Sequence, residues 1–466
     1  MNTFPRISTT TIGHNKDAPR VWLEGKYLID AGFTPANRIQ VEFTKAQVVI
    51  RLAKDGSRVV SSKHKGLIPV LDLNSSALTE AFGTITTLQV HIAEGVITLT
   101  PSHTDVLRET RCRNGKEGSV YSGGGLLTEA ARLAGYKPAF AIEVNPQYAE
   151  IFEKNHDARM FNLSVEDAPL DLLPAVELLT LGIACEPYST ARTKDKITGA
   201  KRDRSLPPEA HPLSDLTIWS ALIIRKLNPA TVIIEQAPGY LTSGAGYMMQ
   251  HFLKRAGYTV EAKVLDPRQY GELTGRRRSV IVAHSGSNFQ WPDPSPSSQT
   301  FASIRDDESI LEEQYFTANT KPWLINHWNT QLAKGNGFAS AQLSDESTSV
   351  PCISKRYMAG QGTGAVVKHR TRPDCWRWLT LNEIRRLHQI PETYLLSDDS
   401  KILSGEVIGQ GVIVSLFQKI IEATRRLGKI QKHIQNTITT ADTPQPSIAP
   451  QLGFTFSYSV DRKSVV

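Results

Sequence analysis

Residues 116–285 alternate between short apolar runs of strand type and segments with helical periodicity. The runs at 178–181, 231–235 and 279–283 are mostly apolar, which is typical of strands buried on both faces. Strands that alternate with helices in this way form a mostly parallel sheet covered by helices. The alternation therefore predicts an α/β fold for residues 115–285.

A smaller β-rich domain is predicted before this region, at residues 19–105. Strand-type runs at 39–43 and 47–52 are repeated about 50 residues later at 88–92 and 96–100. Each copy indicates a strand, a short helix and a hairpin, and one copy alone is too small to bury a core. The sequence therefore predicts a duplicated βαββ domain whose two copies pack together within the chain.

The remaining segments carry weaker signals. Residues 1–18 are polar without periodicity and are predicted to be a flexible lead-in. Residues 286–375 are rich in Ser, Pro and Asn, whereas helical signals return at 380–389 and 414–427. The Thr-, Pro- and Ser-rich tail at 429–466 is predicted to be disordered.

Composition limits the class of protein. A formal net charge of +7 over 466 residues suits a polyanionic partner such as nucleic acid, although many proteins without one are also mildly basic. No run approaches the roughly 18 apolar residues that cross a bilayer, and the N-terminus lacks a signal-peptide pattern. Four scattered cysteines without a CxxC pair argue against a disulfide framework or a zinc site. We therefore expect a cytoplasmic protein without a membrane partner or a metal.

A glycine run follows the first strand of the α/β region. The run YSGGG at 121–125 separates this strand from a helix, and such a turn lets the backbone approach a ligand at the helix N-terminus. Glu143 ends the next strand, where an acid holds ribose hydroxyls in nucleotide-binding folds. Together they favour an adenosine-containing cofactor, although each alone is also compatible with tight packing or a surface glutamate.

A cysteine, Cys185, directly follows the apolar run at 178–181, where sheet enzymes carry reactive groups. The loop at 190–204 contains six Lys and Arg residues, which suits it to close over a phosphate backbone and to stabilise a thiolate. The alternatives are an inert buried cysteine and a solvated run of charge. The combination favours a reactive thiol.

Three more charged residues lie near strand ends. Glu235 ends the run at 231–235 and can face the same cleft as Cys185. Arg276 and Arg278 precede the last strand, and in an extended chain both side chains point to one side. This arrangement suits contacts with phosphate.

The order and spacing of these features resemble those of the DNA cytosine-5 methyltransferases, over about residues 118–426 apart from a variable insert. The glycine run resembles the family's cofactor motif FxGxG, and Glu143 matches the acid of its second motif. Cys185 lies in a run similar to the proline–cysteine nucleophile motif, and Glu235 in one similar to the Glu-Asn-Val motif. Further similarities are those of 270–278 to the QxRxR motif, of 377–391 to the motif that organises the recognition domain, and of 407–412 to the final GNxV motif.

This resemblance implies a Rossmann-like, S-adenosylmethionine-dependent methyltransferase sheet at 115–285, a target-recognition region at 286–375 and a return to the catalytic domain at 376–428. It implies S-adenosylmethionine as cofactor, no metal, and duplex DNA as the partner of a monomeric catalytic unit. The catalytic residues that it indicates are Cys185, Glu235, Arg276 and Arg278. The cofactor-binding residues that it indicates are Tyr121, Ser122, Gly123, Gly125, Glu143, Val144, Asn162, Pro187, Gln410 and Val412.

The resemblance also implies a mechanism. Cytosine C5 is a poor nucleophile, and a thiolate that adds to C6 activates it. Cys185 is expected to form that bond with a base flipped out of the duplex, while Glu235 holds N3 and the exocyclic amine. Arg276 and Arg278 are expected to hold backbone phosphates during this step.

The sequence departs from the family's pattern at several positions, which puts cofactor affinity and loop geometry in more question than the chemistry. The cysteine, the glutamate and both arginines are retained. The departures are Ser119, Leu126, Asn162, Ile183, Ala184, Glu186, Gln236, Leu273, Thr274 and Gln410.

Two segments outside the catalytic motifs indicate nucleic-acid contact. Residues 355–364 and 368–372 are basic or glycine-rich enough to enter a DNA groove, with a solvated loop as the alternative. Residues 22–41 resemble the SymE-like members of the AbrB swapped-hairpin superfamily. That resemblance implies a module that binds nucleic acid, or one that only self-associates or is structural.

Two other functions remain open. One is a tRNA cytosine-5 methyltransferase of the same fold, and the other is a catalytically degenerate DNA-binding regulator. The separate recognition region and the N-terminal module favour DNA over tRNA. Retention of both Cys185 and Glu235 argues against the degenerate regulator.

Overall fold

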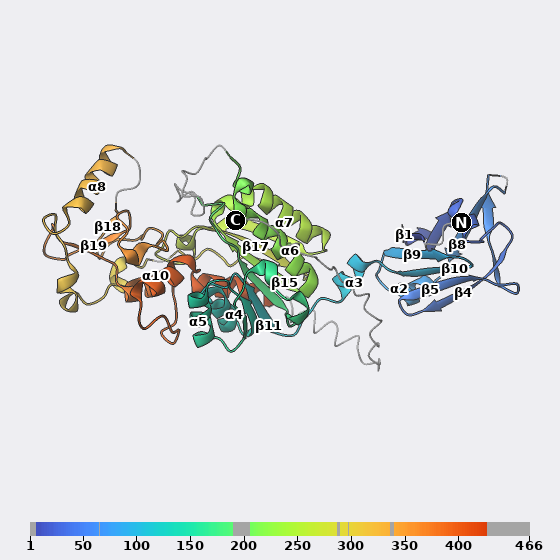
Figure 1. Cartoon of the computed structure of the whole chain (residues 1–466), viewed down its shortest axis with the longest axis horizontal. Coiled ribbons are helices and arrows are strands. Elements are labelled where there is room, and N and C mark those ends of the chain that lie inside the picture. The colour runs from blue at the N-terminus through green and yellow to red at the C-terminus, as the bar shows by residue number, and fades with distance from the viewer. Residues whose placement is uncertain are drawn as a thin grey trace, which may run out of the picture.

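The computed structural model describes residues 6–64, 66–189, 206–286, 289–296, 298–335 and 340–425. Figure 1 shows a β-rich N-terminal part at one end of the molecule, joined by α3 (His103–Glu109) to a central α/β part. The part that contains α8 (Pro322–Ala333) lies at the opposite end. The basic loop at 190–204 and the tail at 429–466 lie outside the described residues.

The N-terminal part consists of two copies of one unit. Strand β3 of the first copy pairs antiparallel with β8 of the second, and β5 pairs with β10, so both copies share one core. The predicted duplication of strand, short helix and hairpin is confirmed. The first copy contains β3 (Ala18–Glu24), α1 (Tyr27–Asp30), β4 (Arg38–Thr44) and β5 (Gln47–Leu52), and the second contains β8 (Ile68–Asn74), α2 (Ala77–Phe82), β9 (Thr87–Ala93) and β10 (Val96–Pro101).

The prediction of a flexible lead-in at 1–18 is wrong for the residues described there. Strand β1 (Arg6–Thr11) pairs with β9 at the edge of a six-stranded sheet, and β2 (Gly13–Asn15) pairs with β3 in a four-stranded sheet. An edge strand needs ladder hydrogen bonds but no apolar face, and β-branched threonines favour it. The polar sequence of β1 therefore gave no periodicity from which the strand could be predicted. The short strands β6 (Arg58–Val59) and β7 (Ser61–Lys63) complete the two sheets.

The central part is a seven-stranded sheet in the order β13-β12-β11-β14-β15-β17-β16. The first five strands are parallel, and β17 runs antiparallel between β15 and β16. The strands are β11 (Lys116–Val120), β12 (Lys137–Ile142), β13 (Arg159–Phe161), β14 (Leu178–Gly182), β15 (Thr231–Gln236), β16 (Thr259–Leu265) and β17 (Arg278–His284). The helices are α4 (Leu126–Leu133), α5 (Pro146–Asn155), α6 (Leu216–Leu227) and α7 (Gly244–Arg255). The predicted α/β fold is confirmed.

Hydrophobic cores cover both faces of this sheet. Along β15, Val232 and Ile234 belong to the core that contains α6 and α7, whereas Ile233 belongs to the core that contains α4. This division follows from the alternation of side chains along a strand. Because β11, β12, β14 and β15 are parallel, the residues that follow them meet at one edge of the sheet, where ligands bind in open α/β folds.

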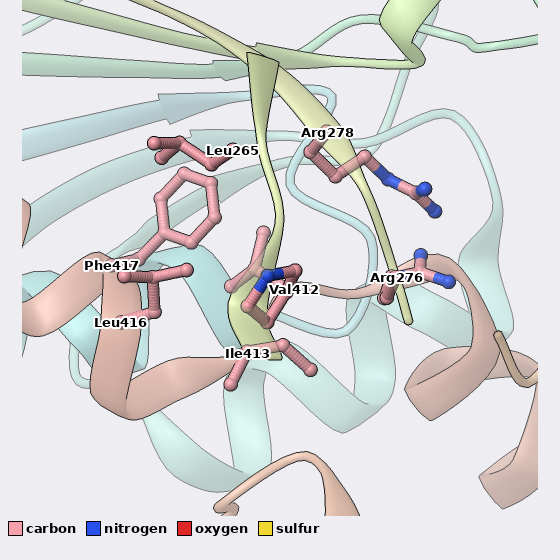
Figure 2. A pocket seen from close by; sticks show the side chains of 8 residues that line it. Leu265, Arg276, Arg278, Val412, Ile413, Leu416 and Phe417 are labelled. Atoms are coloured by element: carbon pink, nitrogen blue, oxygen red, sulfur yellow. The ribbon is translucent and has the colours of Figure 1, made fainter. Parts of the chain in front are cut away.

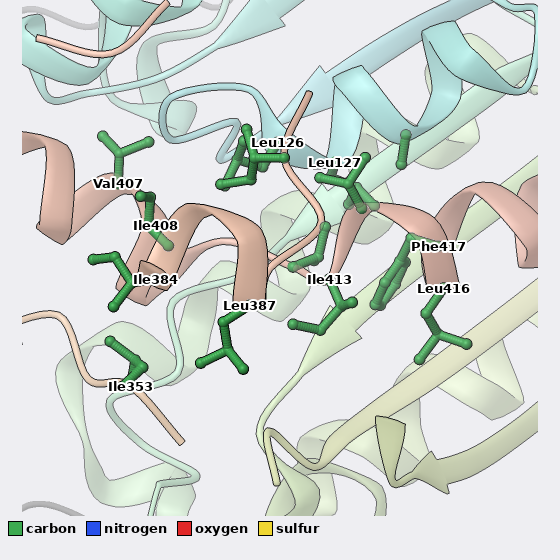
Figure 3. Packing of buried hydrophobic residues seen from close by; sticks show 14 of the residues in the cluster. Leu126, Leu127, Ile353, Ile384, Leu387, Val407, Ile408, Ile413, Leu416 and Phe417 are labelled. Carbon is green, nitrogen blue, oxygen red and sulfur yellow. The ribbon is translucent and has the colours of Figure 1, made fainter. Parts of the chain in front are cut away.

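The C-terminal segment packs against α4. Figure 3 shows Val407, Ile408 and Phe417 in one core with Leu126 and Leu127. The helices of this segment are α9 (Leu381–Leu387), α10 (Lys401–Gln410) and Val414–Arg425. No single helix in the described part of the chain is long and apolar enough to cross a membrane, although α10 and Val414–Arg425 pass that test as a bent pair.

The region at 286–375 has its own small core. Strands β18 (Gln342–Leu343) and β19 (Val366–Lys368) form a three-stranded sheet with β20 (Trp376–Trp378). Trp328 of α8 packs with Trp376 of β20 in an aromatic cluster. The boundary predicted at residue 375 therefore falls inside a sheet, because β20 pairs with β19 rather than with the catalytic sheet.

Candidate active site

The site begins at the turn between β11 and α4. Tyr121, Gly123 and Gly125 have positive φ angles of 57°, 54° and 94°. A Cβ on Gly125 would lie 2.8 Å from the ring of His156, whereas a Cβ on Gly123 would meet nothing within 4 Å. The turn therefore presents open backbone at the start of α4, where amide groups and the helix dipole favour negatively charged or polar ligand atoms.

Glu143 follows β12 and lies against this turn. Its carboxylate oxygens accept hydrogen bonds from the backbone N–H groups of Gly123 and Asn145, each at 2.8 Å. Burial raises the pKa of this carboxyl, and the backbone donors act against that rise. Each oxygen retains a lone pair, and two such acceptors fit the two hydroxyls of a ribose.

Other residues predicted to bind the cofactor gather here. The Asn162 amide donates to the carbonyl oxygen of Glu143 at 2.7 Å. Val144 is 66% exposed and gives an apolar surface beside the carboxylate. The hydroxyl of Tyr121 instead donates to the Leu216 carbonyl of α6 at 3.0 Å, so the turn offers a ligand its backbone rather than this hydroxyl. The carboxylate, the apolar surface and the open turn fit an adenosine-containing cofactor.

Cys185 lies just beyond the end of β14 and is exposed. Gln236 ends β15, and its amide donates to the carbonyl oxygens of Ile183 at 3.0 Å and of Ala184 at 2.8 Å. These bonds fix the backbone directly before the thiol. Although Gln236 departs from the expected asparagine, it therefore has a clear structural role at the nucleophile loop.

Glu235 and Arg278 form an ion pair at the same edge. Nε of Arg278 lies 2.7 Å from Oε1 of Glu235, with side chains 18% and 10% exposed. Burial lowers the pKa of Arg278, but Glu235 and nearby thiols outweigh that effect and the guanidinium stays charged. Although the residue as a whole is exposed, desolvation around its sulfur and the neighbouring Glu186 raise the pKa of Cys185, which Arg278 partly offsets. The resting cysteine is therefore a thiol whose ionisation Arg278 assists.

Residues 116–426 match the family of C-5 cytosine-specific DNA methylases, a span that covers most of the chain. The chain belongs to this family. Its predicted membership is confirmed, and the protein is a cytosine-5 methyltransferase.

Relatives and solved structures agree with this assignment. The type II methyltransferase M.HpaII of Haemophilus parainfluenzae is 22% identical over 331 residues, which are 65% of this chain and 88% of that protein. The tRNA (cytosine(38)-C(5))-methyltransferase of Schizosaccharomyces pombe is 22% identical over 299 residues, 59% of this chain and 85% of that one. The methyltransferase EhMeth of Entamoeba histolytica has a similar fold, with a TM-score of 0.54 and 14% identity. The match covers 68% of this chain and 99% of that one.

One predicted arginine of this methylase has a different environment from the expected one. Figure 2 shows the guanidinium groups of Arg276 and Arg278 pointing the same way beside a small pocket, as predicted from their spacing. Arg276 is only 2% exposed, and its Nη1 donates to Cys352 Sγ at 3.4 Å and to the Ile353 carbonyl at 3.2 Å. The expected contact of Arg276 with backbone phosphates would require these contacts to change, and it stays a prediction. A buried guanidinium that already donates to protein acceptors does not reach a phosphate in this conformation.

A second thiol at the methylase site, Cys352, was missed by the sequence analysis. This residue of the variable region is exposed and accepts the hydrogen bond from Arg276. Although the residue as a whole is exposed, desolvation around its sulfur opposes ionisation, but the guanidinium groups of Arg276 and Arg278 outweigh that effect and lower the pKa of Cys352. No motif surrounds Cys352, and only the presence of a cysteine in the insert was available as a signal.

Two further residues that the sequence analysis missed contact the backbone carbonyl groups of the glycine turn. His156 Nε2 lies 3.1 Å from the carbonyl oxygen of Gly125, and the hydroxyl of Tyr394 donates to that of Gly124. Burial lowers the pKa of His156 to about 4, so the ring is neutral at pH 7 and its Nε2–H can donate. Tyr394 therefore connects the C-terminal segment of the methylase to the glycine turn.

The last predicted motif meets the start of α4. A Cβ on Gly411 would lie 2.3 Å from the Leu126 side chain, so α10 ends directly against this helix. Gln410 is exposed at this junction, whereas Val412 is buried and lines the pocket in Figure 2. Pro187 is also buried, two residues beyond Cys185. Within the described ranges, no group of three or more His, Cys, Asp or Glu residues could hold a metal ion.

Proposed function

We propose that this methyltransferase transfers a methyl group from S-adenosylmethionine to C5 of a cytosine flipped out of duplex DNA, through a covalent bond between Cys185 and the base. One observation carries the proposal. The exposed Cys185 and the Glu235–Arg278 ion pair lie at the same sheet edge as the glycine turn and Glu143. A nucleophile and a cofactor cradle on one edge suit transfer between two bound molecules.

Cys185 would begin the reaction by adding to C6 of the cytosine. The electron pair of the C5–C6 double bond is displaced onto C5 and the ring, which makes C5 nucleophilic. Bound S-adenosylmethionine supplies an electrophilic methyl group. After C5 has been methylated, removal of its proton restores the double bond and expels the Cys185 thiolate.

Glu235 and Arg278 would stabilise the charges that develop on the base and on the Cys185 sulfur during these steps. In the resting ion pair Glu235 is an acceptor, which suits the exocyclic amino group of cytosine. A proton on its second oxygen would let it also donate to N3 and disperse the negative charge that addition places on the ring. Arg278 would stabilise the thiolate form of Cys185, whose pKa it lowers against the effects of burial and Glu186.

The cofactor would lie along the same edge. Glu143 would accept the ribose hydroxyls, with Val144 and Asn162 beside the purine. The backbone of the glycine turn at 122–125 and the junction of Gln410 with α4 would hold the rest of the molecule. The open Gly123 face and the free lone pairs of Glu143 support this arrangement.

Duplex DNA is the substrate that we favour over tRNA. Part of the region at 286–375 packs around an aromatic cluster of its own and a small three-stranded sheet, which suits recognition of a target sequence, while residues such as Ile353 and Tyr357 join the core of the catalytic part. The formal net charge of +7 and the additional N-terminal part support a large polyanionic partner. The likeness to a tRNA methyltransferase keeps RNA as the second candidate.

A labelling experiment tests the proposal. The full chain is incubated with tritiated S-adenosylmethionine and either duplex DNA of mixed sequence or tRNA, beside the variants Cys185→Ser and Cys112→Ser. We expect label in C5 of DNA cytosine, lost by about a thousandfold or more in Cys185→Ser and retained in Cys112→Ser. Label only in tRNA would contradict the choice of DNA and identify RNA as the substrate. Label in neither nucleic acid would contradict the proposed reaction.

A further inference from the structure

Four polar side chains from three parts of the chain meet at the junction of α5 and α10. Lys355 of the variable region has its Nζ 3.7 Å from Oε2 of Glu406 and 3.4 Å from Oε1 of Gln410. The hydroxyl of Tyr148 donates to Glu406 at 2.7 Å, and the Lys355 ammonium lies 5.1 Å from the centre of the Tyr148 ring. None of the functions described above uses the Lys355–Glu406 pair.

Close backbone packing fixes Lys355 in this place. A Cβ on Gly409 of α10 would lie 2.5 Å from the Ser354 carbonyl oxygen and 2.8 Å from the Lys355 nitrogen. One turn earlier, a Cβ on Gly405 would lie 2.2 Å from the side chain of Met358. The two glycines let the variable segment dock directly on α10, so the position of Lys355 does not depend on a flexible loop.

The cluster lies at the rim of the proposed cofactor cradle. Gln410 directly precedes Gly411, which packs on Leu126 at the start of α4, and Tyr148 belongs to the first turn of the helix that follows Glu143. Burial raises the pKa of Glu143, and the positive charge of Lys355 is close enough to act against that rise. Lys355 and Glu406 therefore lie near both the ribose acid and the end of α10 that packs on the start of α4.

We infer that Lys355 and Glu406 bind the amino-acid end of the cofactor, the ammonium of Lys355 pairing with its α-carboxylate and the carboxylate of Glu406 with its α-ammonium. This inference rests on the proposed use of S-adenosylmethionine. With the adenosine at Glu143 and Val144, the amino-acid end extends towards the start of α4, where a carboxylate is favoured.

The chemistry of the pair matches a zwitterion. Lys355 and Glu406 carry opposite charges, and their 3.7 Å separation is longer than a direct hydrogen bond, so the resting pair is loose. Their side chains are 32% and 27% exposed, which leaves them open to a ligand while partly screened from water. Lys355 has three N–H donors and Glu406 two oxygens, enough to keep Gln410 and Tyr148 while binding the ligand.

The alternative is that the pair only ties the variable segment to α10. Two ligands distinguish these roles: S-adenosylhomocysteine carries the amino-acid end, and 5′-methylthioadenosine keeps the adenosine and sulfur but lacks it. A structural defect would weaken both ligands alike. Loss of a contact with the amino-acid end would weaken S-adenosylhomocysteine alone.

Isothermal titration of the full chain with each ligand tests the inference. Lys355→Met and Glu406→Gln should each weaken S-adenosylhomocysteine about tenfold and leave 5′-methylthioadenosine within about twofold. The matched control is Lys401→Met, which removes an exposed cation from the opposite end of α10 and should change neither affinity.

The possible failures can be told apart. If both ligands bind the unmodified chain and the two variants weaken both equally or neither, the inference is overturned and the cofactor assignment stands. If neither ligand binds the unmodified chain, the cofactor assignment falls and the inference with it. Should one variant misfold, retained 5′-methylthioadenosine binding by the other still decides between the two roles.

Discussion

Glu117 is a carboxyl group without access to solvent, in strand β11, which leads to the glycine turn. It is 0% exposed, and its Oε1 accepts hydrogen bonds from the hydroxyls of Thr180 at 2.6 Å and Thr128 at 3.2 Å. Its second oxygen has no hydrogen-bond partner in the described part of the chain. Burial raises the pKa of Glu117 to about 7, so the protonated form is favoured in the folded chain.

This group makes stability depend on pH. The ordinary pKa is 4.5, so the folded state holds the proton more tightly than the unfolded chain, and stability falls as pH rises from 4.5 to about 7. Glu117→Gln keeps an acceptor for both threonines but carries no charge. Relative to the unmodified chain, it should gain about 3 kcal/mol more stability at pH 8 than at pH 4.5.

Chemical denaturation at the two pH values measures this difference. The control is Glu153→Gln on the exposed side of α5, which should show no comparable change with pH. An equal effect of Glu117→Gln at both pH values would show that the buried carboxyl does not titrate in this range.

At the scale of elements, α9 shows how a short helix anchors the small sheet of the region at 286–375. Thr380 and Glu383 form a capping box, in which the Thr380 hydroxyl accepts from the Glu383 N–H and the Glu383 carboxylate accepts from the Thr380 N–H. The same carboxylate pairs with Arg377 of β20 at 2.6 Å, and both side chains are 0% exposed. One residue therefore joins the helix cap to the small sheet.

Removing one partner of the Arg377–Glu383 ion pair should strongly lower the free energy of unfolding, because the other charge stays buried. Glu383→Ala leaves the buried guanidinium of Arg377 without its counter-charge, and we expect a loss of about 3–5 kcal/mol in the free energy of unfolding. Thr380→Ala removes the cap contact and the hydrogen bond that the Thr380 hydroxyl donates to the Asp306 carboxylate, but leaves the buried ion pair intact, and it should cost about 1–2 kcal/mol. Urea denaturation of both variants checks the ranking. Similar losses for the two would contradict a tightly coupled buried pair.

The elements differ in how well the sequence predicts them. The apolar parallel strands and the residues at their ends, such as Glu143 and Cys185, were predictable because the signal is local. Strand β1 was not, since its polar residues pair at a sheet edge and bury no apolar face. Cys352 and Lys355 reach the site only through the folding of a region without periodicity, so their contacts with Arg276 and Glu406 left no local pattern.

At the scale of the whole molecule, the N-terminal part and the α/β part have separate cores. The buried residues of the N-terminal core lie between Val21 and Leu99, and those of the catalytic cores begin at Val120. Helix α3 is bonded to both parts through few contacts: its Asp105 accepts from the Thr87 N–H at 3.0 Å, and Asn228 donates to its Leu107 carbonyl at 2.7 Å. The two parts are therefore expected to unfold independently.

Calorimetry tests this independence. The full chain should show two heat-absorption transitions, and a chain that begins at Ser102 should lose one of them while the other stays within about 2 °C. A single cooperative transition, or a large shift of the second on truncation, would mean that the two parts stabilise each other.

The central claim is that Cys185 bonds covalently to cytosine, and trapping that bond tests it most directly. Duplex DNA made with 5-fluorocytosine throughout needs no knowledge of the target sequence, and the fluorine at C5 cannot leave as a proton does. With S-adenosylmethionine present, the chain should form a complex with this DNA that survives detergent, and peptide mapping should place the bond on Cys185. Absence of the complex, its formation only with fluorinated tRNA, or a bond mapped to Cys352 would contradict the account.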